Sequence, residues 1–339
     1  IKPGMERPIP VEEAPRISII IVNHNGQRFL DALGQSLRRQ TYRNHEVLCV
    51  DNGSSDDSVT FLRTQFPEVQ VIEAENRGYG AGCNRGARAA TGTYVMFLNE
   101  DYILPKDCLE RLARTYERLR REDPEIGALA CSQSAYDGTP NAPVYPGVID
   151  LFGFMAPNRR KRTRGAFIPG CPFFTTRALF LKSDGFCEQI FLYGEDIDLS
   201  WRFTLIGKRN YSAPEIQVQH YEGGSLSGFP PKKIYYLLHA TPIALFNNFA
   251  GPTLALFLFL HVLFVLTFVN VGLLVFTRGE LRYQIAALRA FADFLRKLPS
   301  LIPYRARVQR SRVISDWTFL KQHFTFVPSL LRLRSYRRL

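Results

Sequence analysis

The sequence lacks the cysteine patterns that mark zinc-binding or disulfide-stapled domains. Its six cysteines are scattered, with no C-x-x-C pair and no Cys/His spacing typical of zinc. We therefore expect the cysteines to be small buried side chains, in a protein that is kept in a reducing compartment. Residues 1–16 also lack the apolar core of a signal peptide, so we expect no export signal in them.

Acidic residues are scarce in the last part of the chain. Residues 278–339 carry 14 Lys and Arg against three acids, a local net charge of +11 out of +12 for all 339 residues. A nearly neutral body with a basic tail predicts an anionic partner, either membrane headgroups or nucleic acid. No nucleic-acid motif accompanies the tail, and an apolar segment adjoins it, so we predict a membrane surface and no nucleic acid.

The first 132 residues alternate between short apolar runs and helical spacing. Residues 16–25 form a β-branched run typical of a buried strand, and further runs lie at 46–50, 69–73 and 93–98. This alternation predicts an α/β fold whose mostly parallel sheet has helices on both faces and binds ligands beyond its carboxyl ends. Polar clusters follow at those ends: Asn23-His24-Asn25, Asp51-Asn52-Gly53-Ser54-Ser55-Asp56 and Asn99-Glu100-Asp101.

The pattern becomes irregular after a strand expected near 126–132. Residues 133–169 are rich in Pro, Gly and Tyr and include a basic cluster at 159–164. A loop of this length in a compact enzyme predicts a lid or a binding loop. Residues 193–202 then predict a helix whose acidic first turn suits the positive end of the helix dipole.

Residues 252–276 contain no charged side chain. As a helix they would be about 37 Å long, enough for a ~30 Å hydrocarbon core. Residues 234–250 are also mostly apolar, so a helical hairpin that dips into the bilayer competes with a single span. Positive charges on both flanks, at 232–233 and at Arg278 and Arg282, favour two cytoplasmic ends, and we prefer the hairpin or monotopic arrangement.

The next segment has the pattern of an amphipathic interfacial helix. Arg282, Arg289 and Arg296 recur every seven residues and predict a ridge for anionic headgroups. A second stripe at helical spacing is apolar: Leu281, Ile285, Leu288, Phe291, Leu295 and Leu298.

Seven motifs follow one another in a fixed order. They are IIIVNHNG at 19–26, DNGSSD at 51–56, ENRGYGAGCN at 75–84, FLNED at 97–101, GFCE at 185–188, YGEDIDLSWR at 193–202 and HYEGGS at 220–225. Together they resemble family 2 inverting glycosyltransferases of the GT-A fold, and in detail the rhamnosyltransferase-like branch that builds cell-surface polysaccharides. The resemblance covers about residues 16–225, and the basic C-terminal region looks like the tails of membrane-associated members.

Transfer from a nucleoside diphosphate sugar leaves negative charge on the departing diphosphate, which a divalent cation neutralises. The resemblance implies that Asp101 holds this Mg²⁺ or Mn²⁺ as the end of a D-x-D motif, with His220 as a further ligand. Asn99 replaces the first acid of that motif. Mg²⁺ commonly binds through one or two carboxylates plus substrate phosphates, so we expect the site to tolerate the replacement.

The acceptor hydroxyl needs a base whose pKa lies near the operating pH. The resemblance places this base in the Glu195-Asp196 pair, and we expect Asp196 with Glu195 as the alternative. Arg202, one or two turns later, is expected either to pair with Glu195 or Asp198 or to reach the diphosphate.

Donor recognition is expected at the strand ends. Asp51 is expected to meet the nucleotide base or ribose, and Asn23 and Asn25 to shape the pocket. The glycine run that begins at Gly78 lets a helix N-terminus approach phosphate. Asn76 and Asn84 beside this run are further expected donor contacts.

The expected function is transfer of a sugar, with L-rhamnose from dTDP-rhamnose as the specific candidate and UDP-sugars as the other donors, onto a polyprenyl-diphosphate-linked saccharide. The basic cluster at 159–164 is a candidate for holding the acceptor diphosphate. The expected location is the cytoplasmic face of the cell membrane. The expected organisation is an extension (1–15), a GT-A catalytic domain (16–230), a membrane-embedded segment (231–277) and a basic amphipathic tail (278–339).

Three alternatives stay open at this point. Asn99 would suit a catalytically inactive membrane-anchored scaffold. A processive polysaccharide synthase would normally have several spans and a Q-x-x-R-W-type motif, which this sequence lacks. In a soluble transferase the apolar segment would instead form the interface of a homo-oligomer.

Overall fold

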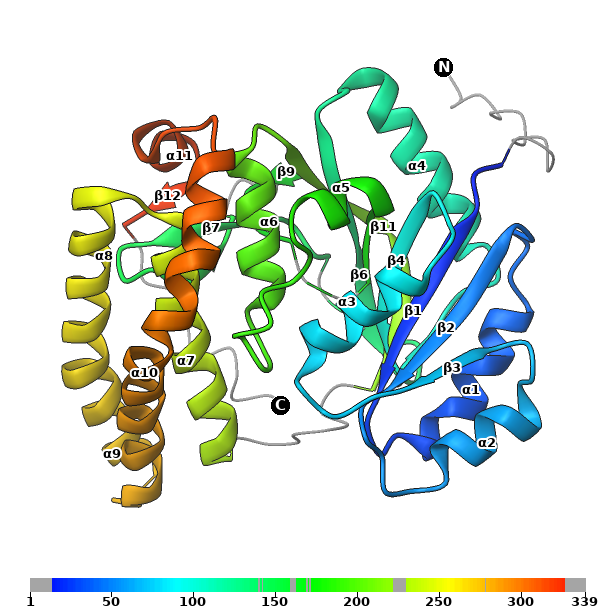
Figure 1. The fold of residues 1–339 in the computed structure, drawn as a ribbon, viewed down its shortest axis with the longest axis horizontal. Helices are drawn as coiled ribbons and strands as arrows, with labels where there is room; N and C mark the ends of the chain where they lie inside the picture. The colour runs from blue at the N-terminus through cyan, green and yellow to red at the C-terminus, as the bar shows by residue number, and fades with distance from the viewer. Residues whose placement is uncertain are drawn as a thin grey trace.

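The computed structural model describes residues 14–139, 141, 143–158, 163–168, 170, 172–221, 230–277 and 279–326. Within them, one large mixed sheet lies between two groups of helices, and a bundle of long helices packs against one side (Figure 1). The strands of the large sheet, in spatial order, are β3 (Gln70–Glu73), β2 (His45–Asp51), β1 (Ile17–Asn23), β4 (Tyr94–Asn99), β10 (Phe173–Thr176), β6 (Ile126–Ala135), β11 (Arg209–His220) and β5 (Tyr102–Ile103), with β9 (Arg164–Gly165) beside β11.

The first half of the sheet is parallel, as the alternating sequence predicts. β1 pairs in parallel with β2 and with β4, and β2 with β3. β10 is antiparallel to both β4 and β6, so it reverses the direction in the middle of the sheet. This insertion was not predicted, because an apolar run in the sequence does not show which strands it will join. The predicted GT-A-like α/β architecture is confirmed.

The two faces of β1 pack against different helices, because successive side chains of a strand point to opposite faces. Ile19 and Ile21 pack with α1 (Gln27–Arg38), α2 (Ser58–Gln65) and α4 (Cys108–Glu122). Ile20 and Val22 pack with α3 (Tyr79–Ala89), α5 (Arg177–Lys182) and α6 (Glu195–Leu205). The five described cysteines are buried, as expected.

The C-terminal helices form the bundle at the side of the large sheet and its flanking helices. They are α7 (Pro231–Asn248), α8 (Gly251–Phe264), a π-helical turn (Val265–Val269), α9 (Asn270–Phe276), α10 (Leu281–Ser311) and α11 (Asp316–His323). A small second sheet joins β12 (Phe324–Thr325), β7 (Gly147–Asp150) and β8 (Met155–Pro157). Trp201 of α6, Phe249 and Phe319 of α11 share one apolar cluster, so the C-terminal helices share a core with the helices that flank the large sheet.

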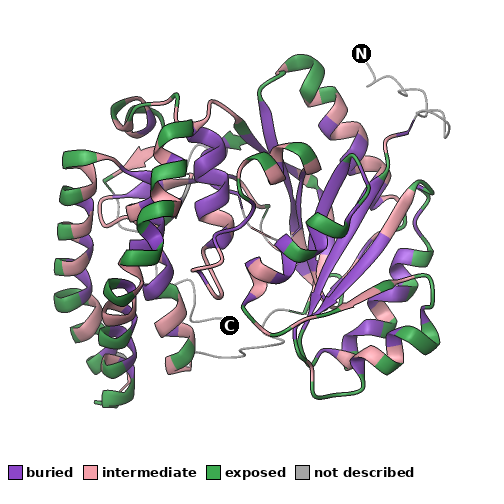
Figure 2. Cartoon of the chain, viewed as in Figure 1, coloured by how far each residue is buried: buried purple, intermediate pink, exposed green. Residues whose placement is uncertain are grey.

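One helical segment, Gly251–Val275, is long and apolar enough to cross a membrane by length and composition, and most of it is not buried. α7 is different: Leu238, Ile243 and Leu245 are buried against other parts of the protein. Its partners include α10 and α6. The apolar segment at 234–250 is therefore a core helix of the protein, while α8 and α9 stay at the surface, where Figure 2 shows alternating exposed and half-buried residues.

Gly86 sets how closely α3 approaches the sheet. A Cβ at this position would lie 2.4 Å from Ile20 Cγ2 of β1. We expect Gly86→Ala to lower the free energy of unfolding by about 1–3 kcal/mol, because the added methyl group overpacks the core. Urea unfolding of the purified protein measures the change. Gly272→Ala is the matched control, since a Cβ there meets no atom within 4 Å; an equal loss in both variants would contradict the packing explanation.

Candidate functional site

Amide and carboxylate side chains meet at the carboxyl ends of β1 and β2. Asn23 and Asp51 are paired in register, and Asn23 Nδ2 donates to Asp51 Oδ1 at 2.8 Å. Ser54 donates its backbone N–H to Asp51 Oδ2 at 2.9 Å and accepts from the Asn25 backbone N–H at 2.9 Å. The structure thus brings together Asn23, Asn25 and Asp51, the residues expected to shape the donor pocket.

Asp101 and His220 face each other beyond the end of β4. β5 and β11 pair antiparallel with His220 opposite Tyr102, and the imidazole stacks on the Tyr102 ring with centroids 4.3 Å apart. His220 Nε2 lies 3.4 Å from Asp101 Oδ1. This oxygen is buried and accepts no hydrogen bond from the described residues. A buried acceptor without a donor, beside an imidazole nitrogen, fits a divalent cation.

Asn99 ends β4 and is half-buried, two residues before Asp101. No group of three or more His, Cys, Asp or Glu side chains that could hold a metal occurs among the described residues. The chain therefore offers two such ligands here, and the other positions around a cation would go to Asn99, substrate phosphates or water.

Asn76 and Gly78 form the turn that leads into α3. Asn76 Oδ1 accepts from the Gly78 N–H, and Asn52 Nδ2 donates to the Gly78 carbonyl, both at 3.1 Å. Gly78 has a φ of 98°, and a Cβ there would lie 2.4 Å from the Phe191 carbonyl oxygen, so only glycine fits. The Tyr79 N–H donates to the same oxygen at 3.0 Å. The N-terminus of α3 is thus held against the segment that leads into α6.

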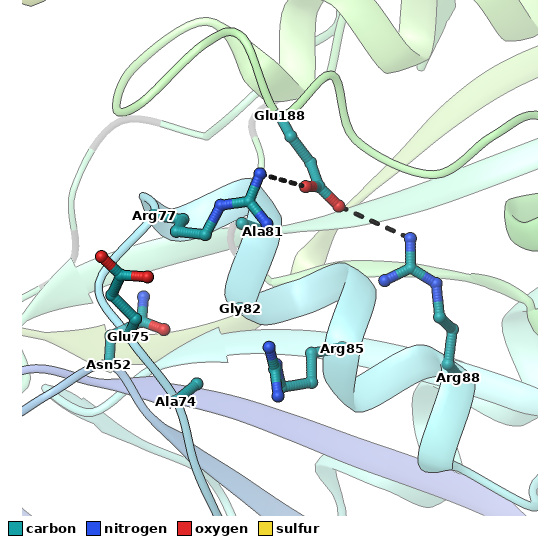
Figure 3. A pocket seen from close by; sticks show the side chains of 9 residues that line it. All are labelled: Asn52, Ala74, Glu75, Arg77, Ala81, Gly82, Arg85, Arg88 and Glu188. Carbon is teal, nitrogen blue, oxygen red and sulfur yellow. Dashed lines mark hydrogen bonds and ion pairs between the residues drawn. The ribbon is translucent and has the colours of Figure 1, made fainter.

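A pocket with several arginines opens between α3 and the ends of β2 and β3 (Figure 3). Glu188 bridges two of them, at 3.7 Å from Arg77 and 3.5 Å from Arg88. Arg85 extends from the same helix as Arg88. The lining residues are Asn52, Ala74, Glu75, Arg77, Ala81, Gly82, Arg85, Arg88 and Glu188. This pocket was not predicted from the sequence, although the spacing of Arg85 and Arg88 places both arginines on one side of an expected helix and could have indicated it.

Glu195 and Asp196 open α6 after Gly194, which takes a left-handed conformation. Glu195 Oε2 is buried and accepts no hydrogen bond from the described residues. Burial, and secondarily the charge of Asp196, raises the pKa of Glu195 to about 8. Burial also raises the pKa of Asp196, although hydrogen bonds from backbone N–H groups oppose the shift. A Cβ on Gly80 of α3 would lie 3.8 Å from the Glu195 Cβ, so this acid pair adjoins the N-terminus of α3.

The structure corrects the expectation for Arg202. Its side chain is buried, and each guanidinium nitrogen already has a partner: Nε donates to Asp198 at 2.8 Å, Nη1 to the Ser183 carbonyl and Nη2 to the Gly185 carbonyl at 2.6 Å. Of the alternatives left open by the sequence, the Asp198 pair is the one observed. A guanidinium used in this way is not available to a diphosphate.

Asn84 is corrected for the same reason. It is buried, its Oδ1 accepts from the Phe186 N–H at 2.8 Å, and its Nδ2 donates to the Phe186 carbonyl at 2.8 Å. These bonds fix the segment at 185–188 to α3. We assign both Asn84 and Arg202 a structural role in place of the expected donor contact.

Asn23, Asn25 and Asp51 form a cluster at the strand ends. This strand-end cluster, the Asp101–His220 pair and the acid pair of α6 lie at one edge of the molecule. The first two follow the carboxyl ends of the parallel strands β1, β2 and β4. The acid pair reaches this edge through its contact with the start of α3, which follows β3 (Figure 1). The basic cluster at 159–162 and Gly223 and Ser225 of the HYEGGS motif lie outside the described residues.

Removal of the Arg202 charge is expected to unfold the site. Arg202→Met leaves the Asp198 carboxylate buried without its cation, which typically costs about 3–5 kcal/mol of stability. Urea unfolding measures this loss. The matched control is Arg118→Met, which breaks an exposed pair with Glu122 at the same i,i+4 spacing, and should cost at most about 1 kcal/mol. Normal stability of Arg202→Met with weaker donor binding would restore the original expectation.

Comparison with known proteins gives a consistent assignment. Residues 18–180 match the model of Glycosyl transferase family 2. The uncharacterized glycosyltransferase alr2836 of Nostoc is 36% identical over 30% of this chain and 33% of its own length. The O-antigen biosynthesis protein RfbC of Myxococcus xanthus is 27% identical over 72% of this chain and 20% of its own length. The chain thus spans a third or less of the length of these relatives.

The solved structure of GalNAc-T7 with UDP, GalNAc and Mn²⁺ is similar in fold. Its TM-score is 0.58, over 69% of this chain and 48% of that chain, at 17% identity. The acidic motif after β4 and nearly all of the parallel strands β1 to β4 are within residues 18–180, the part that the family model matches. Over these residues the chain is thus similar to family 2 glycosyltransferases, and its fold is GT-A-like.

Proposed function

We propose that the chain is a metal-dependent inverting glycosyltransferase that moves a sugar from a nucleoside diphosphate donor to a saccharide acceptor. The observation that carries this proposal is the buried Asp101 Oδ1, which accepts no hydrogen bond from the described residues and lies 3.4 Å from His220 Nε2. An unsatisfied buried carboxylate oxygen costs stability unless a ligand completes it. A cation with its nucleotide diphosphate supplies that ligand.

Asp101 and His220 would hold Mg²⁺ or Mn²⁺, with Asn99 beside them. The ion would supply Lewis-acid stabilisation of the charge that develops on the diphosphate. Asn23, Asn25 and Asp51 would shape the donor pocket, and the turn of Asn76 and Gly78 would present the N-terminus of α3 to the phosphates. GalNAc-T7, whose fold is similar, was solved with UDP and Mn²⁺, which supports a nucleotide and a divalent cation.

The acid pair at the start of α6 would supply the base. A carboxylate with a pKa raised toward neutrality accepts a proton from the acceptor hydroxyl more readily than an ordinary one. Asp196 remains our choice for this role and Glu195 the alternative. The burial of Glu195 beside the half-buried Asp196 would also limit the access of water to the reacting hydroxyl.

The proposal extends to the donor, the acceptor and the location of the enzyme. The donor would be dTDP-rhamnose or a UDP-sugar, and similarity to an O-antigen biosynthesis protein supports a polysaccharide product. A polyprenyl-diphosphate-linked saccharide would be the acceptor, at the cytoplasmic face of the membrane. The apolar segment Gly251–Val275 supports membrane association.

Asp101→Asn tests the metal site. We expect the wild-type protein to gain apparent stability from its donor nucleotide plus Mn²⁺, about 2.7 kcal/mol at a hundredfold excess over the dissociation constant. Asp101→Asn should lose the part of this gain that depends on Mn²⁺, because the amide carries no charge. Thermal shift over UDP- and dTDP-sugars, with and without Mn²⁺ or Mg²⁺, measures it. Asp31→Asn on the exposed side of α1 is the control, and an identical response in both variants would refute the proposed ligand.

Glu195→Gln tests the raised pKa of the acid pair. A carboxyl whose pKa is higher in the folded state stabilises the protein below its ordinary pKa of 4.5, and this contribution is lost as the pH rises through about 8. The amide has no charge to bury, so the melting temperature of Glu195→Gln should exceed that of the wild type increasingly as the pH rises. Glu122→Gln on the exposed end of α4 should show no such trend. A difference that does not vary with pH would contradict the assignment.

A further inference from the structure

Two neighbouring helices leave many large apolar side chains exposed. On the segment from α8 to α9 the exposed fractions range from 43% at Leu274 to 73% at Val275. The exposed side chains of this segment are Leu256, Phe259, Leu263, Leu266, Phe268, Val271, Leu274 and Val275. Monomeric soluble proteins rarely expose so large a contiguous apolar surface, so this face requires a partner.

α10 adds a second apolar stripe. Leu281, Ile285, Leu288 and Leu295 are exposed by 47–65%, and offsets of 4, 7 and 14 residues place them on one side of a helix. The opposite side, which includes Ala290, is buried against α7 and α9. Four of the six residues of the apolar stripe predicted from the sequence are therefore turned out of the protein, while Phe291 and Leu298 pack against it.

The arginines of α10 border this stripe. Arg282, Arg289 and Arg296 are exposed, and each lies about 100° around the helix from the leucine directly before it. They lie on the side of Asp293, which accepts a hydrogen bond from Tyr235 of α7 at 2.9 Å. The other border of the stripe is Phe291, which packs in a cluster with Leu258 of α8. Around α10, the order is thus α8–α9, apolar stripe, arginine border and α7.

We infer that the exposed side chains of α8–α9 and α10 form one docking surface for an anionic lipid bilayer, and that α8–α9 lies along the bilayer without crossing it. The inference rests on the proposed membrane association and specifies its surface and its geometry. The exposed apolar side chains would enter the acyl boundary, while the arginine border would meet lipid phosphates.

The position of α10 decides between lying along the membrane and crossing it. α10 begins at Leu281 and returns alongside α9 (Figure 1). Arg282 and Arg296 are separated by about 21 Å along this helix at 1.5 Å per residue. An upright α8–α9 would carry the arginine border through the hydrocarbon, where charged side chains are costly. A helix pair lying in the interface leaves every guanidinium within reach of headgroups.

A second copy of the chain fits this surface less well. Self-association would bring together two arginine borders, each part of a segment (residues 278–339) whose net charge is +11. Like charges repel, whereas anionic headgroups neutralise them. The chemistry of the surface therefore favours lipid over a homo-oligomer.

Flotation of the full chain with vesicles tests the surface. The wild type should bind vesicles that mix phosphatidylglycerol with phosphatidylcholine more tightly than phosphatidylcholine alone. The variant R282Q/R289Q/R296Q should lose this preference, by about fivefold per arginine and about a hundredfold in total. The variant I285Q/L288Q/L295Q should lose binding to both kinds of vesicle, by about tenfold per side chain.

The matched control replaces arginines elsewhere. R118Q/R120Q/R121Q makes the same change of charge on α4, on the far side of the molecule (Figure 1), and should bind anionic vesicles as the wild type does. Equal losses in the two arginine variants would show a general charge effect and overturn the surface. A wild type that forms stable dimers and does not bind vesicles, together with a monomeric I285Q/L288Q/L295Q variant, would show that a second copy of the chain covers this surface instead.

A single cysteine at the turn between α9 and α10 tests the geometry. The described native cysteines are buried, so Glu280→Cys should dominate labelling by a membrane-impermeant maleimide. In sealed vesicles with the catalytic domain outside, position 280 should label without permeabilisation, as should the control Arg121→Cys. Protection of position 280 until the vesicles are opened would show a transmembrane crossing and overturn the inference.

Donor hydrolysis in detergent separates this inference from the proposed function. The α10 variants should hydrolyse the nucleotide sugar at the wild-type rate, because none of these side chains belongs to the site. An inactive wild type that still binds vesicles as described would refute the proposed function and leave the docking surface intact.

Discussion

Asp198 is buried in the first turn of α6 with no exposed surface, and a carboxylate in that position must be neutralised or fully hydrogen-bonded. Arg202 supplies the charge, while Asn247 and Asn248 of α7 donate to Asp198 Oδ1 at 3.2 and 3.0 Å. One carboxylate therefore joins α6 to the C-terminal helices. The orientation of α6, and with it the position of the acid pair, depends on this network.

The Asp198 network explains how a buried and a half-buried acid can stand side by side at the start of the same helix. Glu195 and Asp196 have no cation of their own among the contacts described, and their pKa values are raised. The fully compensated charge of Asp198 holds α6 in place. The helix can therefore tolerate the poorly compensated carboxyl groups of Glu195 and Asp196 in the same turn. Carboxyl groups with raised pKa values lower the stability of the folded protein, and such groups are typical of sites where a proton is exchanged.

The helix that holds α6 in place also packs against α10, which presents apolar surface. α7 packs on α6 with one side and on α10 with another, and α10 presents its leucine stripe and arginine border outward. A docked membrane would thus be connected to the acid pair through the packed helices α10, α7 and α6. In this arrangement a lipid-linked acceptor would reach the site along the protein surface, without leaving the interface.

Local pattern determined much of this protein. Alternating apolar runs established the parallel strands and helices of the first half, because a buried strand and an amphipathic helix each impose a period on the chain. The same logic located the strand-end residues Asn23, Asp51 and Asp101. The spacing of the arginines on α10 was equally legible, since it depends only on the helical repeat.

Tertiary structure alone decided which polar groups already have partners. Arg202 and Asn84 look like ligand contacts in the sequence, yet both spend their hydrogen bonds on backbone carbonyls and N–H groups far along the chain. The antiparallel entry of β10 and the outward turn of the leucine stripe were also settled by packing. The physical reason is that burial and hydrogen-bond satisfaction depend on contacts between distant segments, which no local period encodes.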